Sequence, residues 1–331
     1  MDQLTRKEFL RKAAAAGLAA SALGRLGLLP AQGAEEPAPA SIVVRVTSPR
    51  AIKEGVPAPA VVKAMVDKAV STLAGKPVLA AWKSIFRPTD VVGIKVNCIT
   101  GPRLSTRPET AMAVAQGAVA AGVRPENVII FDRTAGELMT AGFTLNPDGP
   151  GIRCLGVGRN GWDAEPTAFG RFRGPLATLV SDRITALVNV PVLKDHEATG
   201  ITFALKNHFG SIGNAAEQHH DYHGTIADLN AVPAIRTKTR LVLGDCLFGL
   251  AEGGPALQGP DHVWEPKAVL AGFDPVAVDT IAWQLIDEGR RAQQLQPLAA
   301  VGREPRFIAH AAAAGLGTND PAKMKVISLT V

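Results

Sequence analysis

The chain has 331 residues and a formal net charge of +5, and much of that charge lies at its N-terminus. Residues 1–33 hold five basic and two acidic side chains, a net of +3, which leaves +2 for the rest. Since no Lys/Arg-rich run follows and aromatic residues are scarce, the composition argues against a nucleic-acid-binding protein. Three cysteines allow at most one disulfide, and no Cys-x-x-Cys pair supplies the usual iron–sulfur spacing.

The first 33 residues follow the order of an export signal. Four basic residues within the first twelve precede an apolar stretch, 13–29, and small residues stand at Ala31 and Gly33. The apolar stretch is shorter than the ~20 residues that a stable membrane span needs. Phe9-Leu10 favours the twin-arginine export machinery, although Lys7 in place of a second arginine leaves the general secretory route open. We predict a cleaved signal and a periplasmic or extracellular protein; the alternative is an amphipathic helix of the mature fold.

After a Pro/Ala tether at residues 34–40, strand-like and helix-like segments alternate. The predicted strands are 41–47, 91–96, 128–131, 185–192, 240–243, 267–272 and 325–331, and the predicted helices are 59–73, 108–121 and 274–287. Strands separated by helices of this length predict an α/β fold with a mostly parallel sheet and helices on both faces. We expect residues 41–331 to form a single domain, with two closely packed lobes as the variant. Ligands of such sheets bind beyond the carboxyl ends of the strands.

Histidines are concentrated in one segment of the chain. Five of the seven lie between residues 193 and 223: His196, His208, His219, His220 and His223. If residues 218–223 are helical, His219 and His223 share a face and can chelate one ion, whereas a loop would separate them. Neutral imidazole suits zinc, copper, nickel or iron. We predict a divalent transition metal bound through His219, His220 or His223, with His196 or His208 as further ligands. The alternative is that these histidines make structural hydrogen bonds or face solvent.

Three lysines interrupt apolar segments. Lys95 ends the strand VVGIKVN, just before Asn97, Lys194 follows the predicted strand 185–192, and Lys206 lies in an apolar stretch, 201–209, with helical character. A lysine in such a position binds a carboxylate or phosphate, acts as a base when partly desolvated, or forms a buried salt bridge. We expect Lys95, Lys194, Lys206 and His196 to line one cleft at the carboxyl ends of the sheet.

Acidic residues and cysteines also follow predicted strands. Asp274 before Pro275 is typical of a helix cap. Asp279, inside that helix, is the candidate for a buried partner of a lysine, and Asp245 after LVLG is a candidate cofactor-binding residue. Cys98 and Cys246 could form a disulfide, share a metal or be unrelated, and the last alternative is favoured.

Several motifs together resemble a known family. GIKVN at 93–97, VPVLKDH at 190–196, TGITFALKNHFG at 199–210, GLAEGGPALQG at 249–259 and DPVAVD at 274–279 occur in the order of the domain of unknown function 362 family. The resemblance covers about residues 43–286. Members are often exported, and many carry a ferredoxin module that is not expected here. The resemblance implies functional roles for Lys95, Asn97, Lys194, His196, Lys206, Asn207 and Asp279, without naming a reaction.

Two functional hypotheses follow. The first is a metal- or cofactor-dependent enzyme acting on a small-molecule ligand, with Lys194, His196, Lys206, Lys95 and Asp279 as catalytic residues. In this hypothesis Asn97, Asn207 and Asp245 bind the cofactor. The second is a non-catalytic envelope protein that binds a small anion or a metal.

Overall fold

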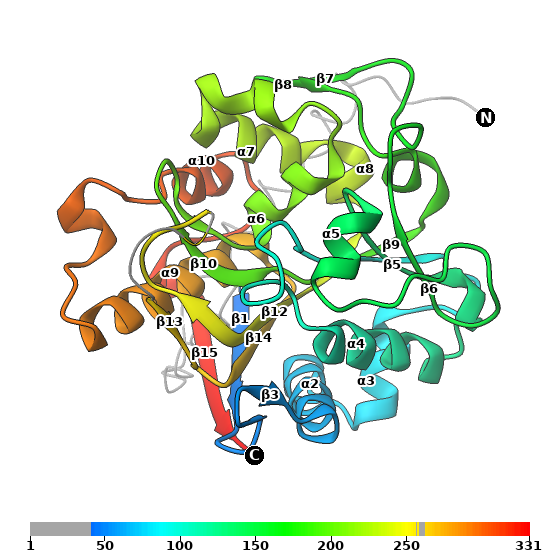
Figure 1. The fold of residues 1–331 in the computed structure, drawn as a ribbon, viewed down its shortest axis with the longest axis horizontal. Helices are drawn as coiled ribbons and strands as arrows, with labels where there is room; N and C mark the ends of the chain where they lie inside the picture. Colours follow the sequence, from blue (N-terminus) through cyan, green and yellow to red (C-terminus); the bar gives the residue numbers. More distant parts are fainter. Residues whose placement is uncertain (1–40, 256, 258–261) are drawn as a thin grey trace, which may run out of the picture. The chain divides into compact units, whose positions relative to one another are not determined.

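The computed structural model describes residues 41–255, 257 and 262–331, and the side chains of all of these except His219 and His220 (Figure 1). The predicted signal and tether lie outside the described residues. The described strands form an eleven-stranded main sheet and two small hairpins. Along the sheet the strands are β15 (Met324–Thr330), β1 (Ser41–Thr47), β14 (Ala268–Gly272), β12 (Thr239–Leu250), β9 (Ala186–Asn189), β4 (Val92–Lys95), β5 (Val128–Asp132) and β6 (Arg153–Gly156).

Three shorter strands join this sheet at β12. β10 (Val192–His196) runs parallel to β12 and pairs with the antiparallel strand β11 (Gly200–Thr202), while β13 (Val263–Trp264) lies antiparallel to β12. The hairpins are β2 (Ile52–Lys53) with β3 (Val56–Pro57) and β7 (Thr167–Phe169) with β8 (Phe172–Gly174). The helices are α2 (Pro59–Ala74), α3 (Val78–Ile85), α4 (Pro108–Ala120), α5 (Ala135–Thr140), α6 (Ala204–Asn207), α7 (Tyr222–Ala231), α8 (Pro233–Arg236), α9 (Pro275–Ala292) and α10 (Phe307–Ala313).

Helices cover both faces of the sheet, because alternate side chains of the strands are apolar on each face. On β12, Leu241 and Leu243 pack with the core under α2, α3 and α4, whereas Val242 packs with the core under α9 and α10. Strands β12, β9, β4, β5 and β6 are parallel neighbours in that order. The predicted α/β fold, with a mostly parallel sheet covered on both faces, is confirmed.

Most predicted elements occur near their predicted positions, and two differ. The expected strand 185–192 is divided into β9 and β10 at Pro191, because proline has no backbone N–H to donate to the ladder. The expected helical stretch 201–209 begins as strand β11 and becomes helical only at α6, in keeping with the β-branched residues Ile201 and Thr202. The predicted cap is present: Asp274 Oδ1 accepts the N–H of Val276 at 2.8 Å.

No disulfide joins any two of the three cysteines. All three are buried and free. Cys98 packs in the core under α2 and α4, whereas Cys246 packs in the core on the opposite face of the sheet. No described helix combines the length and the apolar character needed to cross a bilayer.

The order of strands changes direction between β4 and β9. From β4 the chain adds β5 and then β6 on one side, and it then returns to place β9 on the other side of β4, with Lys95 opposite Asn189. At such a point the connections leave the sheet on opposite faces and open a crevice beyond the carboxyl ends of the strands.

Candidate functional site

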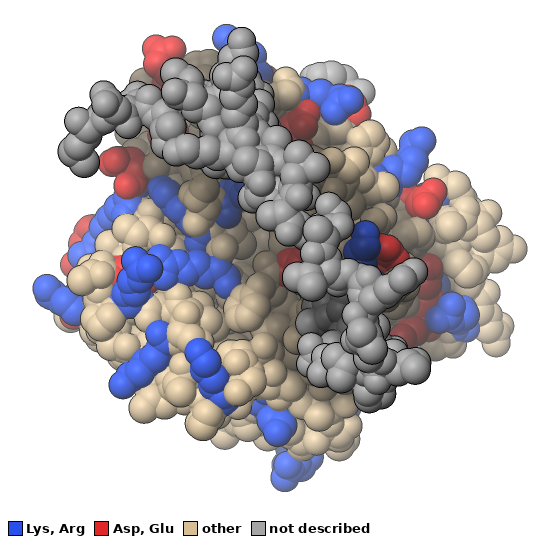
Figure 2. All heavy atoms as spheres, turned by 180° about the vertical axis from the view of Figure 1, so that it is seen from behind, with Lys and Arg blue, Asp and Glu red and all other residues tan. Residues whose placement is uncertain are grey.

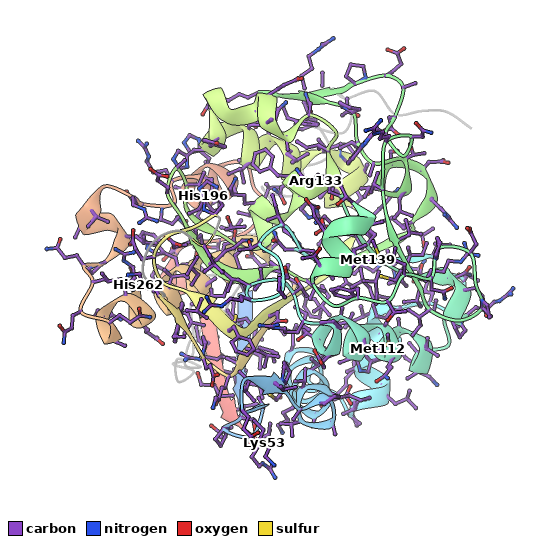
Figure 3. The ribbon with its side chains drawn as sticks, viewed as in Figure 1. Lys53, Met112, Arg133, Met139, His196 and His262 are labelled. Atoms are coloured by element: carbon purple, nitrogen blue, oxygen red, sulfur yellow. The ribbon has the colours of Figure 1, made fainter. Side chains whose placement is uncertain are left out.

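A cleft of about 270 Å³ lies at this position, beyond the carboxyl ends of β4, β5 and β10. The structure brings together in it all four residues that were expected to share a cleft. The polar lining residues are Lys95, Asn97, Asp132, Arg133, Glu137, Lys194, His196, Thr202, Lys206 and Asn207. Figure 3 labels His196, on β10, and Arg133, just after β5, which reach the cleft from separate strands.

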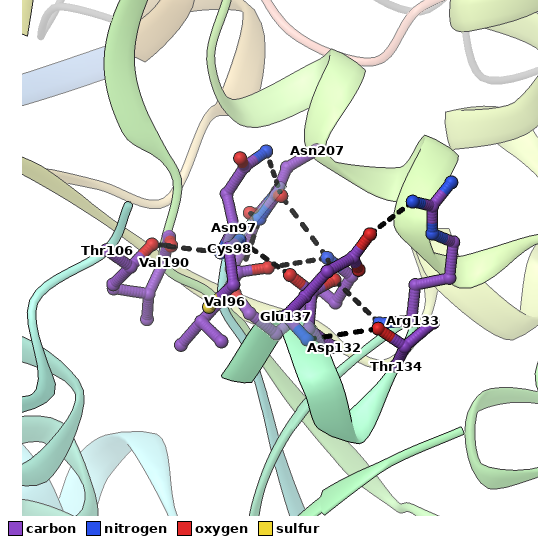
Figure 4. Close-up of polar contacts among 12 residues, drawn as sticks. Val96, Asn97, Cys98, Thr106, Asp132, Arg133, Thr134, Glu137, Val190 and Asn207 are labelled. Atoms are coloured by element: carbon purple, nitrogen blue, oxygen red, sulfur yellow. Dashed lines mark hydrogen bonds and ion pairs between the residues drawn. The ribbon is translucent and has the colours of Figure 1, made fainter. Parts of the chain in front are cut away.

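Lys95 forms a buried ion pair at the base of the cleft. Its Nζ lies 2.7 Å from Asp132 Oδ1, and the two side chains are 1% and 5% exposed. Asp132 Oδ2 accepts the N–H of Cys98 at 2.7 Å (Figure 4). Gly210 packs directly on the pair, since a Cβ built there would lie 2.5 Å from Lys95 Nζ. Asp132 therefore balances the charge of Lys95, and the surrounding groups hold the lysine side chain in place.

A chain of amide side chains connects the lysines. Asn207 Oδ1 accepts from Asn97 Nδ2 at 3.1 Å and from Lys95 Nζ at 3.3 Å (Figure 4). Asn97 Oδ1 in turn accepts from Lys194 Nζ at 2.8 Å, and Asn207 Nδ2 donates to Asn189 Oδ1 at 2.8 Å. These contacts give the two predicted cofactor-binding asparagines, Asn97 and Asn207, a role in positioning the lysine amines.

Lys194 is a buried cation whose hydrogen-bond partners are neutral. It is 1% exposed, and its Nζ donates to Asn97 Oδ1 and, at 2.7 Å, to Thr100 Oγ1. Burial lowers the pKa of Lys194 to about 8, while the nearby charge of Asp132 acts in the opposite direction. Within the described residues no carboxylate lies within ion-pair distance of Lys194.

Lys206 is the more unusual amine. It is 8% exposed, and its Nζ lies 4.4 Å from the ring centroid of Phe209 and 4.9 Å from that of Tyr222. Among the residues described it forms neither a hydrogen bond nor an ion pair. Burial, followed by the charge of Lys194, lowers the pKa of Lys206 to about 7. Many other Lys and Arg side chains lie on the outer surface, as Figure 2 shows for one face.

The remaining polar groups of the cleft add directional contacts. His196 Nδ1 accepts the N–H of Ala198 at 3.1 Å, so a neutral ring carries its proton on Nε2. Thr202 lines the cleft, and its hydroxyl is buried without a partner in the described part of the chain. Sequence reasoning missed Thr202, Thr100 and Asn189. Asn189 ends β9 and Thr202 ends β11, a position that could have indicated them, whereas Thr100 lies in the loop after β4 with no such signal.

A family model described as "Domain of unknown function (DUF362)" matches residues 92–284. The chain belongs to the DUF362 family. The match begins with β4 and ends within α9, so it contains every lining residue of the cleft. A search of curated proteins finds no match to the chain.

One acidic residue of the DUF362 region has a role that differs from the prediction. The expectation that Asp279 pairs with a lysine is wrong, because its carboxylate accepts the N–H groups of Ala204 at 2.6 Å and Leu205 at 3.0 Å. Burial raises the pKa of Asp279 to about 7, and these two hydrogen bonds act against that rise. Asp279 therefore anchors the start of α6, the element that carries Lys206 and Asn207.

Asp245 likewise lies outside the cleft of the DUF362 domain. It is within β12 rather than after a strand, and it accepts the N–H of Arg107 at 2.7 Å and of Leu247 at 3.0 Å. Burial raises its pKa. Its carboxylate thus holds Arg107, the residue before α4, and Leu247 of β12, and the predicted cofactor contact stays a prediction.

The described histidine side chains of residues 193–223 do not gather around one point. A 3₁₀ turn, Ala215–His220, ends before Asp221, and α7 begins at Tyr222, so His219 and His223 do not share a helix face. His223 Nδ1 accepts the N–H of Phe307 at 3.2 Å, and burial lowers its pKa. His208 lines a different cavity from His196. Among the described residues no group of three His, Cys, Asp or Glu could hold a metal. The side chains of His219 and His220 are outside that description, so their part in a metal site stays a prediction.

Proposed function

We propose that this protein is an enzyme that binds a small organic carboxylate in the lysine cleft and moves a proton with the Lys206 amine. The observation that carries the proposal is the pair of buried lysines, Lys194 and Lys206, which face one cleft without a carboxylate partner among the described residues. Buried cations normally have a counterion. An anionic ligand would supply it.

The two lysines differ in the role that we assign to them. Lys194 is held by Asn97 and Thr100, so it can present a fixed positive charge to the carboxylate, with the Thr202 hydroxyl as a further donor. Lys206 is packed against aromatic rings, with a pKa of about 7, so a substantial fraction is neutral at neutral pH. A neutral amine accepts the proton from the substrate, while the electron pair of the broken bond stays on the substrate next to the cationic side chains.

The alternative is a binding protein that captures a small anion without chemistry. The cationic, desolvated cleft favours anion binding in either case, as does the Thr202 hydroxyl, which has no partner among the described residues. The two functions differ in what Lys206 does, because a binding protein needs only its charge and an enzyme needs its basicity.

Hydrogen exchange into the ligand separates them. The protein is incubated in D₂O with small carboxylates that carry an acidic C–H, and loss of the C–H signal is followed by proton NMR. We expect exchange with wild type, none with Lys206→Met, and retained binding without exchange for Lys206→Arg. Binding without exchange in wild type would support the binding protein. An absence of both across the panel would contradict both functions.

Export and metal binding are separate parts of the proposal. We propose cleavage near Gly33 or Ala34 on the strength of the basic, apolar and small-residue order of residues 1–33. N-terminal sequencing of protein from the cell envelope tests it, and a product that begins at Met1 or Asp2 would contradict it. We propose that any bound transition metal is held through His219 and His220. Mass spectrometry of untagged protein measures its metal content and tests this.

A further inference from the structure

A second polar cavity, of about 200 Å³, lies apart from the lysine cleft. Its polar lining comes from Asn189 on β9, His208 after α6, Asn230 on α7, Arg236 at the end of α8 and Thr239 on β12. The rest of its lining is largely apolar and comes from two core clusters, with Leu316 from one and Ile235 from the other. No acidic side chain is among its described lining residues.

The hydrogen bonds of Asn189 determine the state of His208. Asn189 Oδ1 accepts from Asn207 Nδ2 at 2.8 Å, and its Nδ2 donates to Ala204 O at 2.7 Å. The amide is therefore oriented from both ends, and its Nδ2 also donates to His208 Nε2 at 3.2 Å. Because Nε2 accepts, a neutral His208 carries its proton on Nδ1. Burial, with the charge of Lys95 as a smaller cause, lowers the pKa of His208 to about 3, so the ring is neutral.

His208 thus has a buried donor without an acceptor. The side chain is 1% exposed, and its Nδ1 has no partner within the described residues. Buried donors are paired in nearly all folded proteins, because an unpaired one loses its hydrogen bond to water without replacement. The His208 ring lines the cavity, although its Nδ1 is shielded from water, and a ligand that reaches this atom would supply the missing acceptor.

Arg236 indicates the charge of that ligand. It lines the same cavity from the exposed end of α8, and the hydrogen bond that it makes is from Nη2 to Gly315 O, at 2.9 Å. The other N–H groups of the guanidinium have no protein partner in the described structure. A neutral buried donor, a guanidinium group and no lining carboxylate together select an anionic acceptor.

We propose that this cavity is a second ligand site, which binds a small carboxylate through the Nδ1–H of His208 and the guanidinium of Arg236. The site is independent of the proton transfer proposed above. It is nevertheless linked to the lysine cleft, because three amides, Asn189, Asn207 and Asn97, connect His208 to Lys194 by consecutive hydrogen bonds.

Nitrogen-15 NMR of histidine-labelled protein tests the site with acetate as the probe and chloride at equal ionic strength as the control. The His208 signals are assigned with His208→Gln. We expect a protonated Nδ1 and an unprotonated Nε2 in the free protein, and a saturable shift of both signals on addition of acetate. The same titration is made with Lys194→Met, which impairs anion binding in the lysine cleft, and a saturable shift of the His208 signals should persist in this variant.

Two arginine variants decide the outcome. Arg236→Gln should weaken acetate binding at His208 about tenfold, as the loss of one charge-assisted hydrogen bond does. The matched control is Arg291→Gln, an exposed arginine of α9 outside the lining of this cavity, which should leave the affinity unchanged. Melting curves check that both variants are folded. The proposal is overturned if acetate leaves the His208 signals unmoved, if Nδ1 is unprotonated, or if Arg236→Gln binds like wild type.

Discussion

The lysine cleft and the histidine segment contrast in how sequence distance relates to spatial distance. Lys95 and Asn207 are 112 positions apart and form a hydrogen bond, because both lie at the point where the strand order reverses. The histidines of residues 193–223 are close in sequence, yet His196, His208 and His223 face the cleft, a second cavity and α10, respectively. Parallel strands bring their carboxyl ends together, whereas a segment that changes from strand to turn to helix disperses its side chains.

The largest effect should come from breaking the ion pair of the cleft. Asp132→Asn leaves the buried charge of Lys95 uncompensated, and we expect a loss of ~3–5 kcal/mol in the free energy of unfolding. Denaturant unfolding measures it. The matched control is Glu137→Gln, which breaks the more exposed Arg133–Glu137 pair and should cost ~1 kcal/mol or less. Equal losses in the two variants would show that the Lys95–Asp132 pair stabilises the fold no more than the Arg133–Glu137 pair does.

A smaller loss of stability is expected at the glycine that packs on this pair. In Gly210→Ala the new Cβ would lie 2.5 Å from Lys95 Nζ and 2.8 Å from Asp132 Oδ1, so we expect a loss of ~1–3 kcal/mol. Gly136→Ala in α5 is the control, because a Cβ there meets nothing within 4 Å and alanine favours a helix. Thermal melting compares the two, and an unchanged melting temperature in Gly210→Ala would contradict the packing described here.

The pH dependence distinguishes the roles of the two lysines. As pH rises through about 7, Lys206 loses its proton and becomes a base, so exchange activity should rise. As pH rises further through about 8, Lys194 loses the charge that binds the anion, so activity should fall. Each limb should approach a tenfold change per pH unit, with both midpoints moved upward by a bound anion. Lys194→Arg, which stays charged, should lack the alkaline limb, and an unchanged limb in that variant would assign it to another group.

The smallest effect is expected in the histidine segment. Because the helix is interrupted at Asp221 and His223 Nδ1 is occupied by the N–H of Phe307, His223→Ala should leave the metal content unchanged. A His219→Ala/His220→Ala variant should remove any metal that the untagged protein carries. Mass spectrometry measures both, and metal lost on removal of His223 alone would restore the predicted chelate.

Much of the architecture could be predicted because its signals are local. The β-branched segments that became β1, β4 and β5, and the Asp274-Pro275 start of α9, are recognisable within a few residues. Pro191 and the change from strand to helix near Ile201 were also visible in the sequence, but their consequences depend on which neighbours the chain pairs with. Two segments therefore differ from the predicted form, one divided into two strands and one beginning as a strand, while the overall fold is as predicted.

The sequence by itself determined the main strands, three of the helices, the covered parallel sheet and the lysines near its carboxyl ends, because periodicity and strand termini are properties of short segments. Only the tertiary structure decided the partners. Asp279 anchors α6 instead of a lysine, Lys95 pairs with Asp132, and Lys206 stays without a counterion among the described residues. The reason is physical: burial and pairing depend on groups brought together across many tens of residues. These interactions then set whether a lysine is a structural cation or a base.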